Sequence, residues 1–155
     1  TGGALGYYGL FVSTANQTNG GATVANLTAF DTQIVTANGV SNSAGVITFT
    51  IAGVYQVTTE LFYTSTTGAN PTITQWLSQN GTNIANSSQD FQLLGGANTV
   101  QAAVCTWQIS VSASDTIRVY WNSSNTNVSL AYQVALTNPA RPASPSASII
   151  IHQVA

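Results

Sequence analysis

The sequence is poor in charge, and this absence restricts the partners that the protein can bind. Only 4% of its 155 residues are Asp, Glu, Lys or Arg, and lysine is missing altogether. An average soluble protein carries about 25% charged residues. We therefore expect no nucleic-acid partner, because binding phosphates needs clustered Lys and Arg. The surface must instead be covered by Ser, Thr, Asn and Gln.

Cysteine and histidine occur once each, which leaves few ways to build a catalytic or metal site. Cys105 has no second cysteine for an internal disulfide, and its apolar neighbours indicate a small buried residue. His152 is the one histidine that could serve it as a base, but we expect His152 to be structural or to face solvent. Zinc needs several His or Cys ligands and calcium needs clustered carboxylates, so we expect no metal and no cofactor.

The four carboxylates lie in unrelated segments, at Asp31, Glu60, Asp90 and Asp115. Paired carboxylates for general acid–base work are therefore not expected, and the sequence predicts a protein that is not an enzyme. Asp115 stands among serines and is interpreted as a turn residue. Glu60 could pair with Arg118, because both lie in the middle of an expected strand. Two unrelated residues that face solvent or a subunit boundary are an equally good interpretation.

Long apolar runs are also missing. No stretch approaches the roughly 20 residues needed to span a bilayer, so we expect no membrane insertion. The opening residues TGGALG lack an initiator methionine and lack the basic and apolar regions of a signal peptide. We expect the chain to be a processed or excised part of a longer protein, with a stalk or targeting region before it.

Short alternating segments between turns make up the whole chain, and helical periodicity is not sustained anywhere. About ten strands at short spacing predict a sandwich or a barrel. We favour an all-β, two-sheet antiparallel jelly-roll sandwich that forms a single domain over residues 1–155, because alternation with one polar face is what two packed sheets require. The expected strands are Tyr7–Ser13, Ala29–Val35, Val46–Ile51, Tyr55–Tyr63, Thr72–Ser78, Thr82–Ala85, Thr99–Val111, Thr116–Trp121, Ser129–Leu136 and Ala147–Val154.

Two connections have distinctive compositions. Asn80–Gly81 predicts a type I′ hairpin, because both residues tolerate positive φ. The segment 137–148, TNPARPASPSAS, contains three of the four prolines. Proline disfavours regular ladder pairing, so we expect a proline-rich loop that carries the chain to its last strand.

A known family shares several of these patterns. Residues 45–63, GVITFTIAGVYQVTTELFY, resemble the corner of the jelly-roll superfamily that includes tumour necrosis factor and the globular heads of the first complement component. The resemblance continues through the hairpin WQISVSASDTIRVYW and the final ASIIIHQVA, which is similar to the C-terminus of the collagen-like glycoprotein of bacillus exosporia. At the corner itself, Gly53 is expected to adopt a backbone angle closed to residues with a Cβ.

The resemblance implies a trimeric head without enzymatic activity. The chain departs from better-known members in its lack of charge and of a Gly-X-Y repeat, so their specific partners and ion sites do not transfer. The opening GYYGLFVSTANQT and the Asn-rich loops resemble phage fibre domains. We therefore expect a homotrimeric head of a phage fibre or virion surface protein, located at a particle surface or outside the cell. The alternatives are an exosporium or cell-surface glycoprotein head and a soluble trimeric lectin or ligand.

A surface with few charges could still bind a ligand through aromatic rings that stand among amide and hydroxyl groups. A ring can stack on a sugar while amides bind its hydroxyls, so a host-surface glycan is a possible partner. Tyr120 and Trp121 are consecutive, and one of them must face away from the core. That ring could bind a sugar or pack against a neighbouring subunit, and packing is the interpretation we favour.

Two loops beside aromatic residues form the expected ligand site. One is Gly68–Pro71, after Tyr63, and the other is Asn122–Asn127, after Trp121. Six Asn-X-Ser/Thr triplets occur in the sequence, but we interpret them chiefly as turn residues of an Asn-rich chain. The residues expected to contact a ligand are Tyr63, Asn70, Trp121, Asn122, Asn125 and Asn127.

Overall fold

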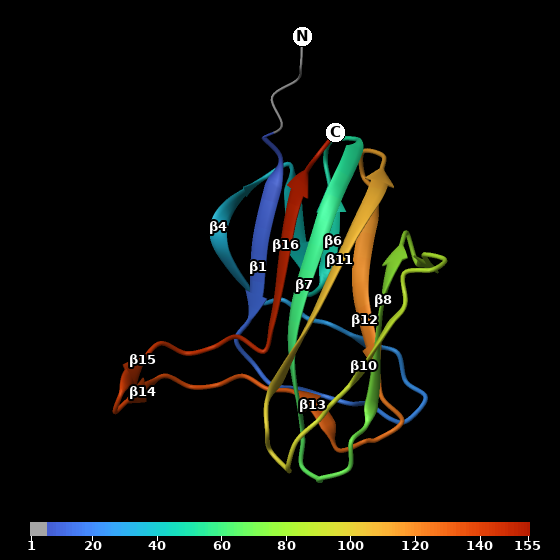
Figure 1. The fold of residues 1–155 in the computed structure, drawn as a ribbon. Helices are drawn as coiled ribbons and strands as arrows, with labels where there is room; N and C mark the ends of the chain where they lie inside the picture. Colours follow the sequence, from blue (N-terminus) through green and yellow to red (C-terminus); the bar gives the residue numbers. More distant parts are fainter. Residues whose placement is uncertain (1–5) are drawn as a thin grey trace.

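The computed structural model describes residues 6–155, which form β-strands joined by turns and loops (Figure 1). The strands in chain order are β1 (Tyr8–Ser13), β2 (Gln17–Thr18), β3 (Asn26–Leu27), β4 (Thr32–Asn38), β5 (Val40–Ser43), β6 (Val46–Phe49), β7 (Gly53–Ser65), β8 (Thr72–Gln79), β9 (Thr82–Asn83), β10 (Gln89–Gln92), β11 (Gln101–Val111), β12 (Thr116–Asn122), β13 (Val128–Leu130), β14 (Leu136–Thr137), β15 (Ala140–Arg141) and β16 (Ala147–Gln153).

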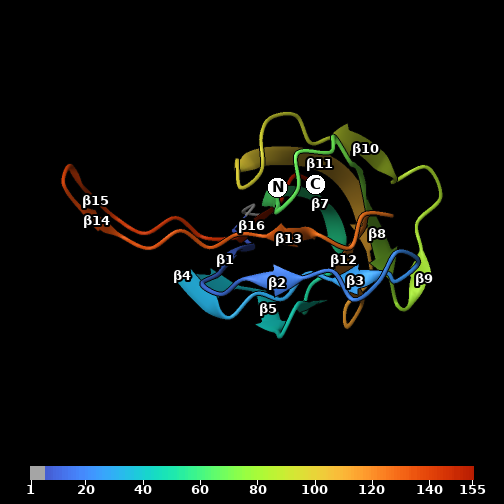
Figure 2. The ribbon, with the colours of Figure 1, turned by 90° about the horizontal axis from the view of Figure 1, so that it is seen from below.

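Two antiparallel sheets pack face to face. Sheet A has the order β2-β13-β7-β16-β1-β4, with β11 also paired to β7. Sheet B has the order β10-β8-β12-β6-β5, with β3 paired to β12 and β9 to β8. Figure 1 shows β1, β16, β7 and β11 side by side in front of sheet B, and Figure 2 shows the two layers from below. The predicted all-β antiparallel sandwich is confirmed.

The 13-residue β7 organises sheet A. It pairs with β11 along its length, and with β16 and β13 over successive parts of the strand. Its side chains alternate strictly between buried and half-buried, as a strand with one face on the core requires.

The core lies between the sheets and is built from the inward positions of every long strand. Burying a large apolar side chain contributes about 1.5–3 kcal/mol, so these residues dominate the stability of the sandwich. The largest fully buried side chains are Trp121, Tyr55, Tyr63, Phe11, Phe30, Phe49, Ile47, Leu61, Ile73, Leu77, Ile117 and Leu130.

Some predicted strand limits are wrong. The strand expected at 29–35 is β4, at Thr32–Asn38, because the Asp31 carboxylate accepts the backbone N–H of Thr14 at 2.9 Å and holds the chain before it in a loop. The strand expected at 129–136 ends at Leu130. The short strands β5 and β10 were not predicted, because their polar sequences VSNS and QDFQ lack apolar alternation.

The two predicted turns differ in outcome. Asn80 and Gly81 have φ of 50° and 82°, so the expected turn with two positive φ angles is confirmed. The expected special angle at Gly53 is wrong, because Gly53 is not among the positive-φ glycines. A Cβ at Gly53 would instead lie 2.7 Å from the carbonyl oxygen of Ala155 and would also contact the Gln153 side chain. Glycine is required there because the end of β16 approaches the backbone closely.

The proline-rich segment is more ordered than predicted. Thr137 pairs with Ala140 and Leu136 with Arg141, so β14 and β15 form a small hairpin. Pro139 sits in its turn, where it interrupts no ladder, which is why the prolines did not prevent pairing. Residues 133–144 form an extended arm that projects from the body of the sandwich in both views (Figures 1 and 2), with Gln133 paired to Ser144 at its base. We call this segment the arm.

Candidate functional site

Two of the expected ligand residues are core residues, which corrects the prediction. Tyr63 is 1% exposed and Trp121 is fully buried. Their rings contact edge to face, with centroids 5.5 Å apart and planes at 68°. Both side chains occupy inward positions of their strands, where they close the core between the sheets. Neither ring can stack on a sugar.

The two expected loops lie close together. Thr66, just before Gly68–Pro71, donates its N–H to the carbonyl oxygen of Asn127 in the second loop, at 3.2 Å. However, the Asn125 carboxamide oxygen accepts the backbone N–H of Asn127 at 2.9 Å, so these two residues serve the turn itself. Asn70 is exposed. The proposed contacts of Asn70, Asn125 and Asn127 with a ligand stay predictions.

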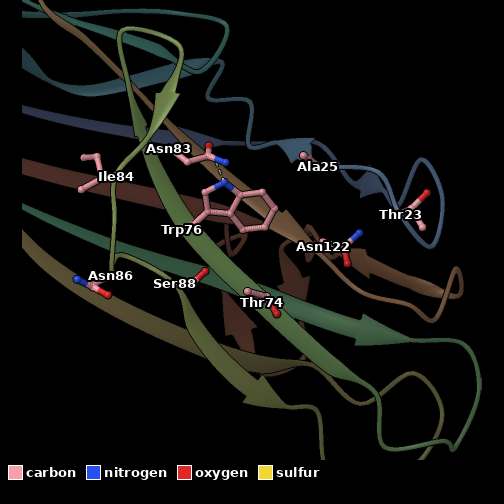
Figure 3. Close-up of a pocket in the computed structure, with 9 residues that line it drawn as sticks. All are labelled: Thr23, Ala25, Thr74, Trp76, Asn83, Ile84, Asn86, Ser88 and Asn122. Atoms are coloured by element: carbon pink, nitrogen blue, oxygen red, sulfur yellow. Dashed lines mark hydrogen bonds between the residues drawn. The ribbon is translucent and has the colours of Figure 1, made fainter.

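A pocket of about 440 Å³ lies elsewhere, on the outer face of sheet B. Trp76 and Thr74 of β8 and Asn122 of β12 contribute to it, together with residues of the loops before β3 and after β9. Figure 3 shows the indole of Trp76 in the middle of the lining residues. The lining comprises Thr23, Ala25, Thr74, Trp76, Asn83, Ile84, Asn86, Ser88 and Asn122. We call it the Trp76 pocket.

The Trp76 ring is held in place on two sides. Its indole Nε1–H donates to the Asn83 carboxamide oxygen at 3.1 Å. The Tyr120 ring, directly opposite in the β8–β12 pairing, stacks beside it with centroids 5.9 Å apart and planes at 22°. Tyr120 is thus the outward member of the Tyr120–Trp121 pair, and it packs within its own chain.

Uncharged polar groups surround the ring. Three carboxamides and three hydroxyls line the Trp76 pocket, and none of the lining residues is charged. Within residues 6–155, the side chains of Thr23, Asn86 and Ser88 hydrogen-bond to no other residue, and the Asn83 amide N–H₂ is likewise unused. The Asn122 N–H₂ donates to the carbonyl oxygen of Val24 at 2.7 Å, which ties the loop before β3 to β12.

Trp76 was not predicted, because the expected site was placed at the rings that precede the loops Gly68–Pro71 and Asn122–Asn127. The signal was present in TITQWLSQ. Ile73, Gln75 and Leu77 are buried and Trp76 alternates with them, so strict alternation places the tryptophan outside and a glutamine inside. Of the residues expected to contact a ligand, Asn122 lines this pocket. It does so together with the Trp76 ring, because the ring of its chain neighbour Trp121 is buried in the core.

A second unusual surface is the outer face of sheet A. Cross-strand neighbours place Leu10, Ile150, Thr58 and Thr106 in one row across four strands. Tyr8, Val104 and Ile150 are 44%, 51% and 45% exposed. Half-buried Phe62 and exposed Ala102 lie opposite each other on the same face. We call this surface the sheet A face, made of Tyr8, Leu10, Phe62, Ala102, Val104 and Ile150.

Two residue pairs considered from the sequence, Cys105 with His152 and Glu60 with Arg118, lie apart in the structure. Cys105 is buried and faces the core, whereas His152 is exposed on the opposite side of sheet A, so they cannot form a nucleophile–base pair. Burial raises the pKa of the Cys105 thiol to about 12, which keeps it protonated. Glu60 and Arg118 also fail to pair, because they point outward from different sheets.

Two further findings hold for residues 6–155. No group of three or more His, Cys, Asp or Glu side chains is placed to hold a metal ion. No helix there is long and apolar enough to cross a membrane.

Comparisons with known proteins identify the fold. Neither a protein-family model nor a curated protein matches the sequence. The crystal structure of murine APRIL at pH 8.5, a tumour-necrosis-factor-family ligand, is similar with a TM-score of 0.61 at 10% identity, over 96% of this chain and 98% of that one. The murine APRIL structure at pH 8.0 gives 0.58 at 12% identity, with the same coverage.

The likeness to murine APRIL confirms the tumour-necrosis-factor-like jelly-roll fold that the corner sequence predicted. An identity of 10–12% shows the fold alone. The resemblance to exosporium and phage fibre proteins stays a prediction.

Proposed function

We propose that this chain is a non-enzymatic head that assembles into a homotrimer through the sheet A face. The observation that carries the proposal is the exposure of Tyr8, Val104 and Ile150 on the outer side of sheet A. A solvated strand face normally presents polar residues outward. Thr58, Glu60 and Thr106 do so here, but they stand among exposed large apolar side chains on the same face. Exposed apolar side chains gathered on one face mark a surface that another protein covers.

The occupant of the sheet A face is best assigned as further copies of the same chain. The family that the corner sequence resembles forms trimers, and the structural likeness to murine APRIL supports membership of that fold. The face also carries little charge. Glu60 is the acidic residue on this face and no Lys or Arg faces it there among residues 6–155, so identical copies can approach without strong repulsion.

The arm supports the same assembly. Val134 and Leu136 are 65% and 43% exposed on it, and it projects away from its own sandwich (Figure 2). An isolated two-stranded hairpin is marginally stable in water. A neighbouring copy would bury these apolar side chains and order the arm.

The charge-poor surface favours a head displayed on a particle. Net charge protects a free protein from association, and this chain has a formal net charge of only −2. We place the head at the tip of a phage fibre or on a virion surface. An exosporium or cell-surface glycoprotein and a soluble trimeric lectin or ligand are the alternative carriers. The rest of the carrier polypeptide would separate them, since a Gly-X-Y stalk, a fibrous shaft and a signal peptide are distinct in sequence.

The assembly surface is tested by placing a charge on it. Ile150→Glu and Val104→Glu would bury carboxylates in the proposed interface, which is strongly unfavourable without a partner charge. We expect both variants to sediment as smaller species than the parent in analytical ultracentrifugation. Ser41→Glu, at an exposed position of β5 in sheet B, is the matched control and should keep the mass of the parent.

Circular dichroism of each variant separates lost assembly from lost folding. Variants that remain folded and keep the parent's mass would contradict the sheet A face as the interface. A parent protein that is itself monomeric would contradict the trimer.

A further inference from the structure

We propose that the Trp76 pocket binds a neutral saccharide unit, with one sugar face stacked on the indole of Trp76. The proposal deepens the role of the proposed head by giving it the glycan partner that the sequence suggested. The site does not depend on trimer formation. The lining residues come from the outer face of sheet B and from the loops before β3 and after β9, whereas the proposed interface is on sheet A.

The indole supplies the apolar half of the site. Trp76 is half-buried, and its outward position on β8 leaves ring surface open to the pocket (Figure 3). The C–H groups on one face of a hexose form an apolar patch that an aromatic ring can cover. Ile84, at the edge of the pocket, extends this apolar floor.

The rim supplies the polar half. A sugar hydroxyl both donates and accepts, so it needs groups of both kinds. The Asn83 amide N–H₂ and the Asn86 carboxamide can donate, and the Ser88 and Thr23 hydroxyls can do either. Because these groups use no partner within residues 6–155, a ligand would gain their hydrogen bonds without breaking internal ones.

The pocket is also preorganised, which reduces the entropy lost on binding. Asn83 fixes the indole through its hydrogen bond at 3.1 Å. The loop that carries Asn86 and Ser88 is anchored by buried Ser87, whose hydroxyl accepts the backbone N–H of Leu77 at 3.1 Å and donates to the carbonyl oxygen of Ile84 at 2.8 Å. The Trp107 indole donates to the carbonyl oxygen of Ser87 at 2.9 Å.

The lining of the Trp76 pocket carries no charged residue, and this favours a neutral sugar over an acidic one. The Asp90 carboxylate, on the neighbouring strand β10, accepts the Thr74 hydroxyl at 2.6 Å and is not among the lining residues. No cation lines it either, so a sialic acid or a sulfated sugar would lack a counter-charge. Hexoses and N-acetylhexosamines are the ligands that fit, and their binding should change little with salt.

The test uses an array of neutral oligosaccharides built from glucose, galactose, mannose and N-acetylglucosamine, with sialylated and sulfated counterparts. The array is probed at about 0.05 M and about 0.5 M NaCl, which brackets weak and strong screening. We expect binding to neutral members at both concentrations. Methyl glycosides of the same sugars then map the contact by saturation-transfer NMR.

Three variants locate the site. Trp76→Ala should weaken binding about tenfold or more, as expected for the loss of a stacked ring. Trp76→Ala also removes the contact with the Tyr120 ring, so weaker binding could come from a change in the sheet surface. Asn86→Ala and Ala25→Arg avoid this, because they change exposed lining positions and leave the core intact. Asn86→Ala should weaken binding and Ala25→Arg should block it. Asn98→Ala, at an exposed loop outside the pocket, is the control and should bind like the parent.

Three results would overturn the proposal. They are an array with no neutral glycan bound, binding confined to charged glycans or lost in high salt, and binding that survives in folded Ala25→Arg and Asn86→Ala variants. A monomeric protein that still binds would leave this proposal standing and contradict only the trimer.

Discussion

At the scale of single residues, strand alternation decides which aromatic rings can meet a partner. Trp121 and Tyr63 lie at inward positions and fill the core, whereas Trp76 and Tyr120 lie at outward positions and form a stacked pair on sheet B. The sequence contained this information, because burial alternates from Thr72 to Leu77 in β8 and along the whole of β12. The prediction chose Tyr63 and Trp121 because each precedes one of the two expected loops, and it did not ask which side of the strand each ring faces.

Gly53 gives a stability prediction at this scale. Its hydrogen atoms face the carbonyl oxygen of Ala155, and a Cβ would lie 2.7 Å from that oxygen. Gly53→Val should therefore lower the free energy of unfolding by about 1–3 kcal/mol, as overpacking does. Urea denaturation of the parent and the variant measures the difference.

Gly68→Ala is the control for Gly53, since a Cβ at Gly68 would meet nothing within 4 Å. It should leave the urea midpoint almost unchanged. A Gly53→Val protein as stable as Gly68→Ala would show that the end of β16 does not pack against Gly53.

Cys105 gives a pH prediction. Burial raises the pKa of its thiol to about 12, above the ordinary value of 9.0. The folded state thus prefers the protonated thiol, and this contribution to stability is present below pH 9 and is lost as the pH rises toward 12. The native thiol should resist a thiol-specific disulfide reagent at pH 8, and should react after unfolding in urea. Fast labelling of the native protein would contradict its burial.

At the scale of elements, the Asn80–Gly81 turn could be predicted from its sequence, but its contact with the β11–β12 turn could not. The pair Asn80–Gly81 predicted a hairpin turn, because both residues tolerate positive φ. Its link to the β11–β12 turn depends on Asp115, 35 positions away along the chain. The Asp115 carboxylate accepts the Ser112 backbone N–H at 2.8 Å, the Asn80 amide at 2.7 Å and the Gln79 amide at 2.9 Å.

These hydrogen bonds, chiefly that from Ser112, lower the pKa of Asp115 below its ordinary value. The ionised carboxylate is therefore favoured in the folded state, and its stabilisation is present at neutral pH and is lost as the pH falls below about 4. Asp115→Ala should have a lower urea midpoint than the parent at pH 7, and the difference should shrink at pH 3. An equal difference at both pH values would contradict the assigned role of the carboxylate.

The arm yields a prediction about assembly. Replacing residues 134–143 by a short Gly-Ser linker removes Val134, Leu136 and the β14–β15 hairpin, none of which belongs to the core. The shortened protein should keep the far-ultraviolet circular dichroism of a β-sandwich but dissociate at a higher concentration than the parent in sedimentation velocity. A shortened protein that dissociates at the same concentration as the parent would show that the arm does not contact a neighbouring copy.

At the scale of the whole molecule, the sequence predicted the sandwich well, but it did not predict the Trp76 pocket or the sheet A face. Alternation and turn chemistry act locally, so the long strands β7, β11 and β12 were found close to their true limits. The Trp76 pocket brings together residues from 23 to 122, and its position depends on which strands become neighbours in sheet B. Pairing of distant segments leaves no local pattern, and short polar strands such as β10 leave almost none.

The mass of the protein in solution decides whether it is a trimer. Size-exclusion chromatography with multi-angle light scattering, at micromolar protein concentration, should give three times the 16.0 kDa mass of one chain. That mass should be the same at low and high salt, because the proposed interface is apolar. A mass of one chain at these concentrations would contradict the account.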